Sequence, residues 1–233
     1  MPRIVVENFD AATNTIQNSA TFVPAGSLVS DRSAYVERVA HSNSWYFIDV
    51  PRNTFQLLEG AGPAVTVTLT PGNYARVSFA TEVARALNAA GGAGNTYACA
   101  VNADTGVLSV SLTAGATNFA FQLASFPRMA AHLGFAASNF AASGVTQAGS
   151  LPVRIAPTFV YLAGLGVKYH GLTNRAIMLL PCGERFTPVE YENSAPEKMV
   201  IADGSLEFFL VDEFGARVGD LRGGILAVDI HVD

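Results

Sequence analysis

Charged side chains are scarce in this sequence of 233 residues. Asp, Glu, Lys and Arg make up 14% of it, against roughly 25% in ordinary globular chains. Lysine is the rarest of the four, because Lys168 and Lys198 are the only two among the 14 basic residues. Protein interfaces favour Arg over Lys, so this composition fits a subunit that lies mostly against other subunits. A GC-rich genome would produce the same bias, and the two explanations are compatible.

Basic clusters and long apolar runs are also missing. The net charge is −5 and no stretch gathers Lys and Arg, which argues against a nucleic-acid surface, since that requires a basic patch. No run of about 18 apolar residues occurs, so we expect no membrane span. The opening residues MPRIVVENFD carry charges inside any apolar segment, and we therefore expect no secretory signal.

The residue patterns that support catalysis or metal binding do not occur either. The histidines and cysteines are His41, His132, His170, His231, Cys99 and Cys182. No histidine lies in a metal-ligand spacing. The two cysteines are far apart in the sequence, which favours two buried thiols over a disulfide. Neither a Gly-x-Ser-x-Gly elbow nor a Cys-His neighbour pair is present. We therefore predict that the protein is not an enzyme. We expect it to have no catalytic, cofactor-binding or metal-binding residues, no cofactor and no small-molecule substrate.

The stretch Val65–Gly92, VTVTLTPGNYARVSFATEVARALNAAGG, has the clearest pattern in the chain. Its first residues alternate apolar and polar, which predicts a strand, and Pro-Gly-Asn then predicts a turn. Phe79, Val83 and Leu87 lie four apart and predict an amphipathic helix over about 78–90. Ser78 is the expected N-cap, and Glu82 is expected in the first turn.

A compact α+β unit is predicted around this helix, over residues 61–137. Asp104-Thr105-Gly106 favours the tip of a hairpin between two strands. It also matches the tripeptide of aspartic proteases, but no second copy supplies the other carboxylate that this chemistry requires. Alternating Phe119, Phe121 and Leu123 predict a further strand. Pro127 near the start and Gly134 past the end predict a short helix over about 127–133.

The remainder is strand-like. β-branched and aromatic runs occur at 35–39, 45–50, 54–58, 159–162, 176–180, 206–211 and 225–232. The fold class that follows is mainly β, a jelly-roll-like β-sandwich with the small α+β unit. We expect residues 1–60 to join 151–233 in the sandwich and 138–150 to be a loop or linker. Residues 1–34 could form an arm or an edge strand.

Two regions together resemble a protein family. The first is VTLTPGNYARVSFATEVARALN, followed by ADTGVLSVSL, FAFQL and AAHLGF. The second is FVYLAGL, followed by AIMLLPCGERFTPVEYENSAPEKMVI and LEFFLVDEFGARVGDLRGGILAVDIHV. In this order they resemble the minor capsid, or penton-type, proteins of icosahedral double-stranded DNA viruses, including adintoviruses, Polinton-like viruses and some giant viruses. The resemblance covers roughly 35–233.

The resemblance implies a virion structural protein, a minor capsid or vertex component. It implies assembly inside the host cell, as a homo-oligomer that also contacts the major capsid protein and other minor capsid proteins. It implies no catalytic residue. Loops 138–150 and 183–198 are candidate contacts. One alternative is a spike or receptor- or glycan-binding module, which would need aromatic residues such as Tyr161, Tyr169 and Tyr191 to converge. A glycosidase would need two carboxylates in one cleft.

Overall fold

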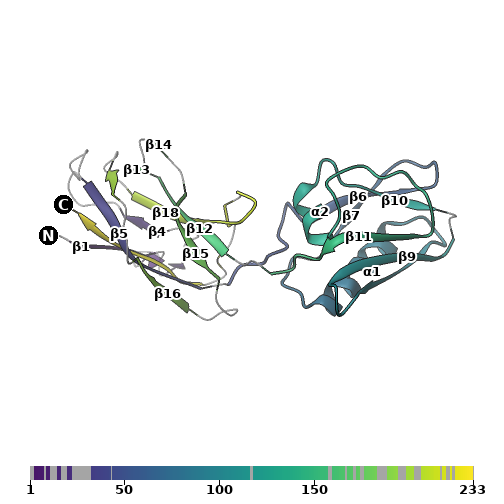
Figure 1. Ribbon diagram of the computed structural model, residues 1–233, viewed down its shortest axis with the longest axis horizontal. Helices are drawn as coiled ribbons and strands as arrows, with labels where there is room; N and C mark the ends of the chain where they lie inside the picture. The colour runs from purple at the N-terminus through teal and green to yellow at the C-terminus, as the bar shows by residue number, and fades with distance from the viewer. Residues whose placement is uncertain are drawn as a thin grey trace. The chain divides into compact units, whose positions relative to one another are not determined.

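The computed structural model divides into two compact units, residues 1–45 with 157–233 (unit 1) and residues 46–156 (unit 2) (Figure 1). It describes residues 3–7, 9–10, 15–16, 20–22, 33–42, 44–115, 118–156, 159–165, 167–169, 172–173, 176–182, 188–193, 198–201, 206–215, 217–218, 221 and 224–232. Each unit has its own hydrophobic core.

Unit 1 contains a seven-stranded sheet in the order β1-β19-β5-β17-β13-β14, with β16 also paired to β5. These strands are β1 (Arg3–Glu7), β5 (Ser33–Ser42), β13 (Val167–Tyr169), β14 (Leu172–Thr173), β16 (Pro188–Glu192), β17 (Met199–Ile201) and β19 (Leu226–Val232). β5 pairs along one edge with β19 and along the other with β16 and then β17. The predicted pairing of N-terminal with C-terminal strands is therefore present.

The second sheet of unit 1 has four strands in the order β15-β12-β18-β4. They are β4 (Ala20–Phe22), β12 (Phe159–Leu165), β15 (Ala176–Pro181) and β18 (Leu206–Val211). β2 (Phe9–Asp10) and β3 (Thr15–Ile16) form a separate ribbon. Buried side chains from both larger sheets make one core, for example Val39 and Val228 from the first and Leu162 and Phe208 from the second. Two sheets that share a core in this way form a jelly-roll-like sandwich.

Unit 2 combines two three-stranded sheets with two helices. The sheets have the orders β10-β6-β7 and β11-β9-β8. The elements are β6 (Thr54–Glu59), β7 (Val65–Thr68), α1 (Arg76–Ala90), β8 (Thr96–Val101), β9 (Val107–Ala114), β10 (Phe119–Gln122), α2 (Pro127–Leu133) and β11 (Thr146–Pro152). Neither helix in the described part of the chain has the length and apolar character needed to cross a bilayer.

Helix α1 buries the predicted stripe, because Phe79, Val83 and Leu87 are fully covered. It starts two residues earlier than predicted, and Ser78 is therefore inside the helix rather than its N-cap. The Ser78 hydroxyl instead accepts a hydrogen bond from the main-chain N–H of Ala75 at 2.9 Å. Glu82 lies beyond the first turn, where its carboxylate accepts the N–H of Thr70 at 2.5 Å. This contact fastens the helix to the turn that follows β7.

Asn88 and Glu59 fasten α1 to β8 and β6. The Asn88 side chain accepts the N–H of Tyr97 at 2.6 Å and donates to its carbonyl at 3.0 Å. It thereby satisfies main-chain groups on β8, an edge strand of its sheet. Glu59, at the end of β6, accepts the N–H of Gly92 at 2.7 Å and the hydroxyl of Tyr97 at 2.5 Å.

Helix α2 has the predicted bounds. Pro127 occupies its first turn, where the missing N–H costs nothing. Gly134 follows with φ 78°, the left-handed conformation that commonly ends helices at glycine. An added Cβ there would lie 2.2 Å from the carbonyl oxygen of Leu151, so close approach of the chain also requires glycine.

Two local predictions are wrong. Residues 45–50 form no strand and contribute a single bridge between Ile48 and Gly72, because Trp45 and Phe47 are buried by packing rather than by strand pairing. The predicted linker 138–150 contains the start of β11, which pairs with β9. Small and polar residues hide this edge strand from hydrophobic periodicity, because most of them stay exposed.

The predicted domain boundaries also differ from the two units. Residues 46–60 belong to unit 2, because β6 pairs with both β7 and β10. Residues 151–156 belong there too, since the end of β11 reaches β9 and the N–H of Val153 bonds to the carbonyl of Gly106. Of the two alternatives for residues 1–34, an edge strand describes Arg3–Glu7, which pairs with β19.

Candidate assembly interface

Three of the four histidines, and both cysteines, lie in the described structure at separate places. His41 and His132 are fully buried and contact main-chain carbonyls, His41 Nε2 that of Pro181 and His132 Nδ1 that of Arg154. The ring of His231 stacks on Tyr35. His170 lies outside the described residues. Within the described residues, no group of three or more His, Cys, Asp or Glu could hold a metal ion.

The cysteines do not pair. Cys99 lies on β8 of unit 2 and Cys182 follows β15 of unit 1, and both are free. Burial raises the pKa of each thiol to about 12. A thiol with such a pKa stays protonated at neutral pH and is a poor nucleophile or metal ligand.

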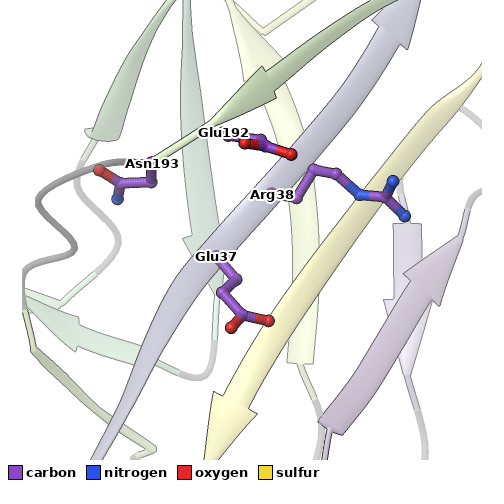
Figure 2. A pocket seen from close by; sticks show the side chains of 4 residues that line it. All are labelled: Glu37, Arg38, Glu192 and Asn193. Atoms are coloured by element: carbon purple, nitrogen blue, oxygen red, sulfur yellow. The ribbon is translucent and has the colours of Figure 1, made fainter.

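An open hollow of about 400 Å³ lies on the seven-stranded sheet, lined by Glu37, Arg38, Glu192 and Asn193. It forms at an irregularity in β5, where Asp229 of β19 pairs with Arg38 but the next residue, Ile230, pairs with Val36. Glu37 is the extra residue of this bulge. Figure 2 shows Glu37 and Arg38 leaving the same strand in different directions, as expected when a bulge redirects a side chain.

Arg38 is surrounded by carboxylates. Its Nε donates to Asp229 Oδ2 at 2.9 Å, and one terminal nitrogen lies 3.7 Å from Glu190. The hydrogen bond that Arg38 donates to Asp229 is the main reason why the pKa of Arg38 is raised. Asp229 is buried, whereas Arg38 is half-buried and Glu190 is largely exposed. This pattern neutralises the buried carboxylate and leaves the rim of the hollow acidic.

Asn193 holds β16 to β5 where the two strands separate. Its main-chain N–H donates to the carbonyl of Glu37 at 2.9 Å. Its side-chain amide donates to the carbonyl of Val36 at 3.1 Å. These bonds replace the regular ladder at the point where β17 becomes the neighbour of β5. The hollow is therefore an ordered feature of the sheet.

The four-stranded sheet presents a different outer surface. We define its apolar face as the outward side chains Phe159, Tyr161, Leu179, Pro181, Phe209 and Val211. Leu179, Tyr161 and Val211 form one row across β15, β12 and β18. Leu179 is 52% exposed, and the Phe159 and Tyr161 rings pack edge to face at 5.6 Å. The guanidinium of Arg217 covers Phe209 at 4.4 Å.

The two outer surfaces of the sandwich thus differ in chemistry. Outward positions of the seven-stranded sheet include charged residues such as Glu37, Arg38 and Glu190. The strands of an antiparallel sheet with one solvated face normally alternate apolar and polar residues. The outer surface of the seven-stranded sheet follows that rule. The apolar face departs from it. Contiguous exposed apolar surface in a folded chain marks an interaction site.

Unit 2 offers a surface without charge. The outward residues in register on β8, β9 and β11 are Ala98, Ala100, Ser109, Ser111, Thr146 and Ala148. Their side chains are small, so the sheet surface is smooth. Thr146 and Ser111 approach each other at 3.3 Å between hydroxyl oxygens. Part of the predicted contact loop 138–150 therefore contributes to an ordered sheet.

Of the three tyrosines of the glycan-binding alternative, the two whose side chains are described, Tyr161 and Tyr191, lie on different sheets. Tyr161 lies on the apolar face of the four-stranded sheet. Tyr191 pairs with Val39 on the other sheet and packs against the sandwich core. The side chain of Tyr169 is outside the described structure. Of the predicted contact segment 183–198, residues 188–193 and 198 are described, and they include Glu192 and Asn193 of the hollow.

Sequence reasoning missed the apolar face, although a signal for it exists. β12, β15 and β18 read FVYLAGL, AIMLLP and LEFFLV, which are nearly continuous apolar runs. Such runs indicate strands covered on both sides. The hollow at Glu37 and Arg38 has no comparable local signal, because it depends on where β16 and β17 meet β5.

The whole chain shares its fold with the penton protein of mavirus, known from a crystal structure of the selenomethionine-labelled protein. The TM-score is 0.52 and the alignment covers 100% of this chain and 99% of that one. Sequence identity over the alignment is 10%. No protein-family model and no curated protein sequence matches the chain. The likeness therefore concerns the fold alone, since few residues are identical.

Proposed function

We propose that this protein is a virion structural component of the penton type, which occupies or supports capsid vertices. The observation that carries the proposal is the likeness in fold to a penton protein, which extends over nearly the full length of both chains. The order of the sequence motifs, which resembles that of minor capsid proteins, supports the same proposal. On this proposal the protein is not an enzyme, and it resides in the capsid after assembly in the host cell.

The surfaces described above fit a protein that works through contacts. The apolar face leaves Leu179 in water unless another molecule covers it. Burying exposed apolar surface is the main driving force of association. Among the partners we propose are further copies of the chain, the major capsid protein and other minor capsid proteins. The scarcity of lysine fits this proposal, because lysine is depleted at interfaces.

The direct test is the mass of the full chain in solution, measured by light scattering after size exclusion over a wide range of concentrations. A discrete pentamer, seen as five-membered rings by electron microscopy, is the expected result for a vertex component. A discrete dimer or trimer would contradict the vertex role and favour a face-cementing or spike role. A monomer at every concentration would contradict self-assembly and favour the binding-module alternative.

A further inference from the structure

His41 lies in the sandwich core of unit 1, between its two sheets. It belongs to β5 of the seven-stranded sheet and is 0% exposed. Its Nε2 atom lies 3.0 Å from the carbonyl oxygen of Pro181, the last residue of β15 in the four-stranded sheet. The imidazole thus connects the two sheets directly.

The contact defines which ring nitrogen carries the proton. A carbonyl oxygen only accepts hydrogen bonds, so Nε2 of His41 is the donor. Nδ1 is then a bare acceptor, and among the described residues it has no hydrogen-bond partner. Trp45 lies beside it with ring centroids 6.5 Å apart. A second proton on Nδ1 would create a buried cation whose new N–H has no acceptor in the described surroundings.

The described carboxylates on β16 and β19, the neighbours of β5 at His41, do not compensate such a charge. Val39 and His41 of β5 point into the core, so the residues between and before them, Ala40 and Arg38, point outward. Glu190 is paired with Ala40, and Glu192 and Asp229 are both paired with Arg38, which places all three on the outer side of the sheet, away from His41.

The other titratable groups on the packed strands do not compensate either. His231 stacks on Tyr35, which is also outward. Cys182, which follows Pro181, keeps its proton because burial raises the pKa of its thiol to about 12, with a smaller contribution from Glu213. At His41 itself, burial is the largest influence and lowers the pKa, while the Pro181 carbonyl opposes it.

We propose that His41 is an acid-sensitive tie between the two sheets, which holds the sandwich together at neutral pH and weakens it under mildly acidic conditions. The direction follows from linkage. The pKa in the folded chain is below the ordinary value of 6.5, so stability is complete above that pH and declines as the pH falls toward the folded-state pKa. If the folded-state pKa of His41 lies one pH unit below the ordinary value, acidification reduces the folding equilibrium constant by up to about tenfold.

The consequence for a capsid rests on the proposed function: a vertex subunit with this tie would loosen in an acidified compartment. The tie itself does not depend on assembly. Its test uses the isolated full chain, and the outcome is therefore distinct from the outcome of the solution-mass measurement.

The chain contains its own reporter, because Trp45 is the only tryptophan and lies beside His41. Urea unfolding followed by Trp45 fluorescence should give a lower midpoint at about pH 5.5 than at about pH 7.5. The variant His41→Gln keeps an amide donor for Pro181 but cannot become charged, so its midpoint should change little between the two conditions. His231→Gln is the matched control, and it should keep the pH dependence of the wild type.

Two outcomes would overturn the proposal: a wild-type midpoint that is the same at both pH values, or a His41→Gln variant that retains the full wild-type decrease. If His41→Gln does not fold, the ring of His41 is titrated in the wild type by NMR while amide exchange is followed at Leu180 on β15. Faster exchange as the ring gains its proton is expected. Titration at or above 6.5, or exchange that does not respond, rejects the tie.

Discussion

Glu82 shows how a single buried carboxylate joins elements that are adjacent in the chain but differ in structure. It accepts the N–H of Thr70 and pairs with Arg85, whose terminal nitrogen lies 2.6 Å from Glu82 Oε1. Burial by itself would raise the pKa of Glu82. The hydrogen bonds from Arg85 and Thr70 outweigh burial, and the pKa is lowered overall. The ionised carboxylate is therefore stabilised in the folded chain.

The variant Glu82→Gln should destabilise unit 2 by about 1.5–3 kcal/mol at neutral pH, the range for hydrogen bonds to charged groups. Because the folded-state pKa lies below the ordinary 4.5, the stabilisation is complete above that pH and is lost as the pH falls through the folded-state pKa. The difference in the free energy of unfolding between the wild type and the variant should therefore become smaller at acidic pH. Urea unfolding followed at 222 nm measures it, since both described helices lie in unit 2.

Thr81→Ala provides the control on the same helix. Thr81 is exposed, and a surface substitution of this kind is expected to change stability by no more than about 0.5 kcal/mol. A constant difference between wild type and Glu82→Gln from neutral to strongly acidic pH would contradict the ion-pair account. The pH range in which protonation of Glu82 reduces the stability of unit 2 lies below the range in which protonation of His41 reduces the stability of unit 1.

The described side chains of β15 depart from the alternation of a half-solvated strand. Leu180 is fully buried in the sandwich core, yet Leu179 beside it is also apolar and half exposed. β15 is the last strand in its sheet. An edge strand with apolar side chains on both faces is a liability unless a partner covers it, and this is why we assign assembly to this surface.

The variant Leu179→Glu should weaken self-association about 100-fold or more, since burying an unpaired carboxylate in a contact costs roughly 3 kcal/mol. Its unfolding midpoint should match that of the wild type, because the side chain does not reach the core. Light scattering over a dilution series measures the association. Val77→Glu is the matched control, because Val77 is 79% exposed on α1 of the other unit. Unchanged association of Leu179→Glu would exclude the apolar face as the contact.

At the level of the whole molecule, the chain makes two cores that share no residue. Unit 2 is continuous in sequence, whereas unit 1 is assembled from residues on either side of it. Hydrogen bonds link residues near both ends of unit 2 to α2: Arg128 donates to the carbonyl of Phe47, and the N–H of Arg154 donates to the carbonyl of His132.

A fragment of residues 46–156 should therefore fold by itself, since its length is typical of a domain with its own core. We expect a single cooperative transition in calorimetry, with tyrosine and helix signals lost together. The same transition should be recognisable in the full chain, where Trp45 reports separately on unit 1. A fragment without a cooperative transition would show that unit 2 needs unit 1 to fold.

Short-range patterns in the sequence were sufficient for the elements whose period is strict. The strand at Val65, the helix that buries Phe79, Val83 and Leu87, and the short helix Pro127–Leu133 were predicted because neighbours two to four residues apart share a face. The same reasoning indicated the mainly β fold class. It failed at 45–50 and at β11, where burial and periodicity do not coincide.

The arrangement of strands in space decided the candidate surfaces. Arg38 and Asp229 are 191 residues apart, and nothing local indicates that one will accept the other's hydrogen bond. The bulge at Glu37, the acidic hollow, the contact from His41 to Pro181 and the row Leu179, Tyr161 and Val211 all depend on strand register. Register is a property of pairs of distant segments, because it is selected by which side chains fill the common core. For that reason the fold class was readable from neighbouring residues, while the surfaces emerged only from the folded chain.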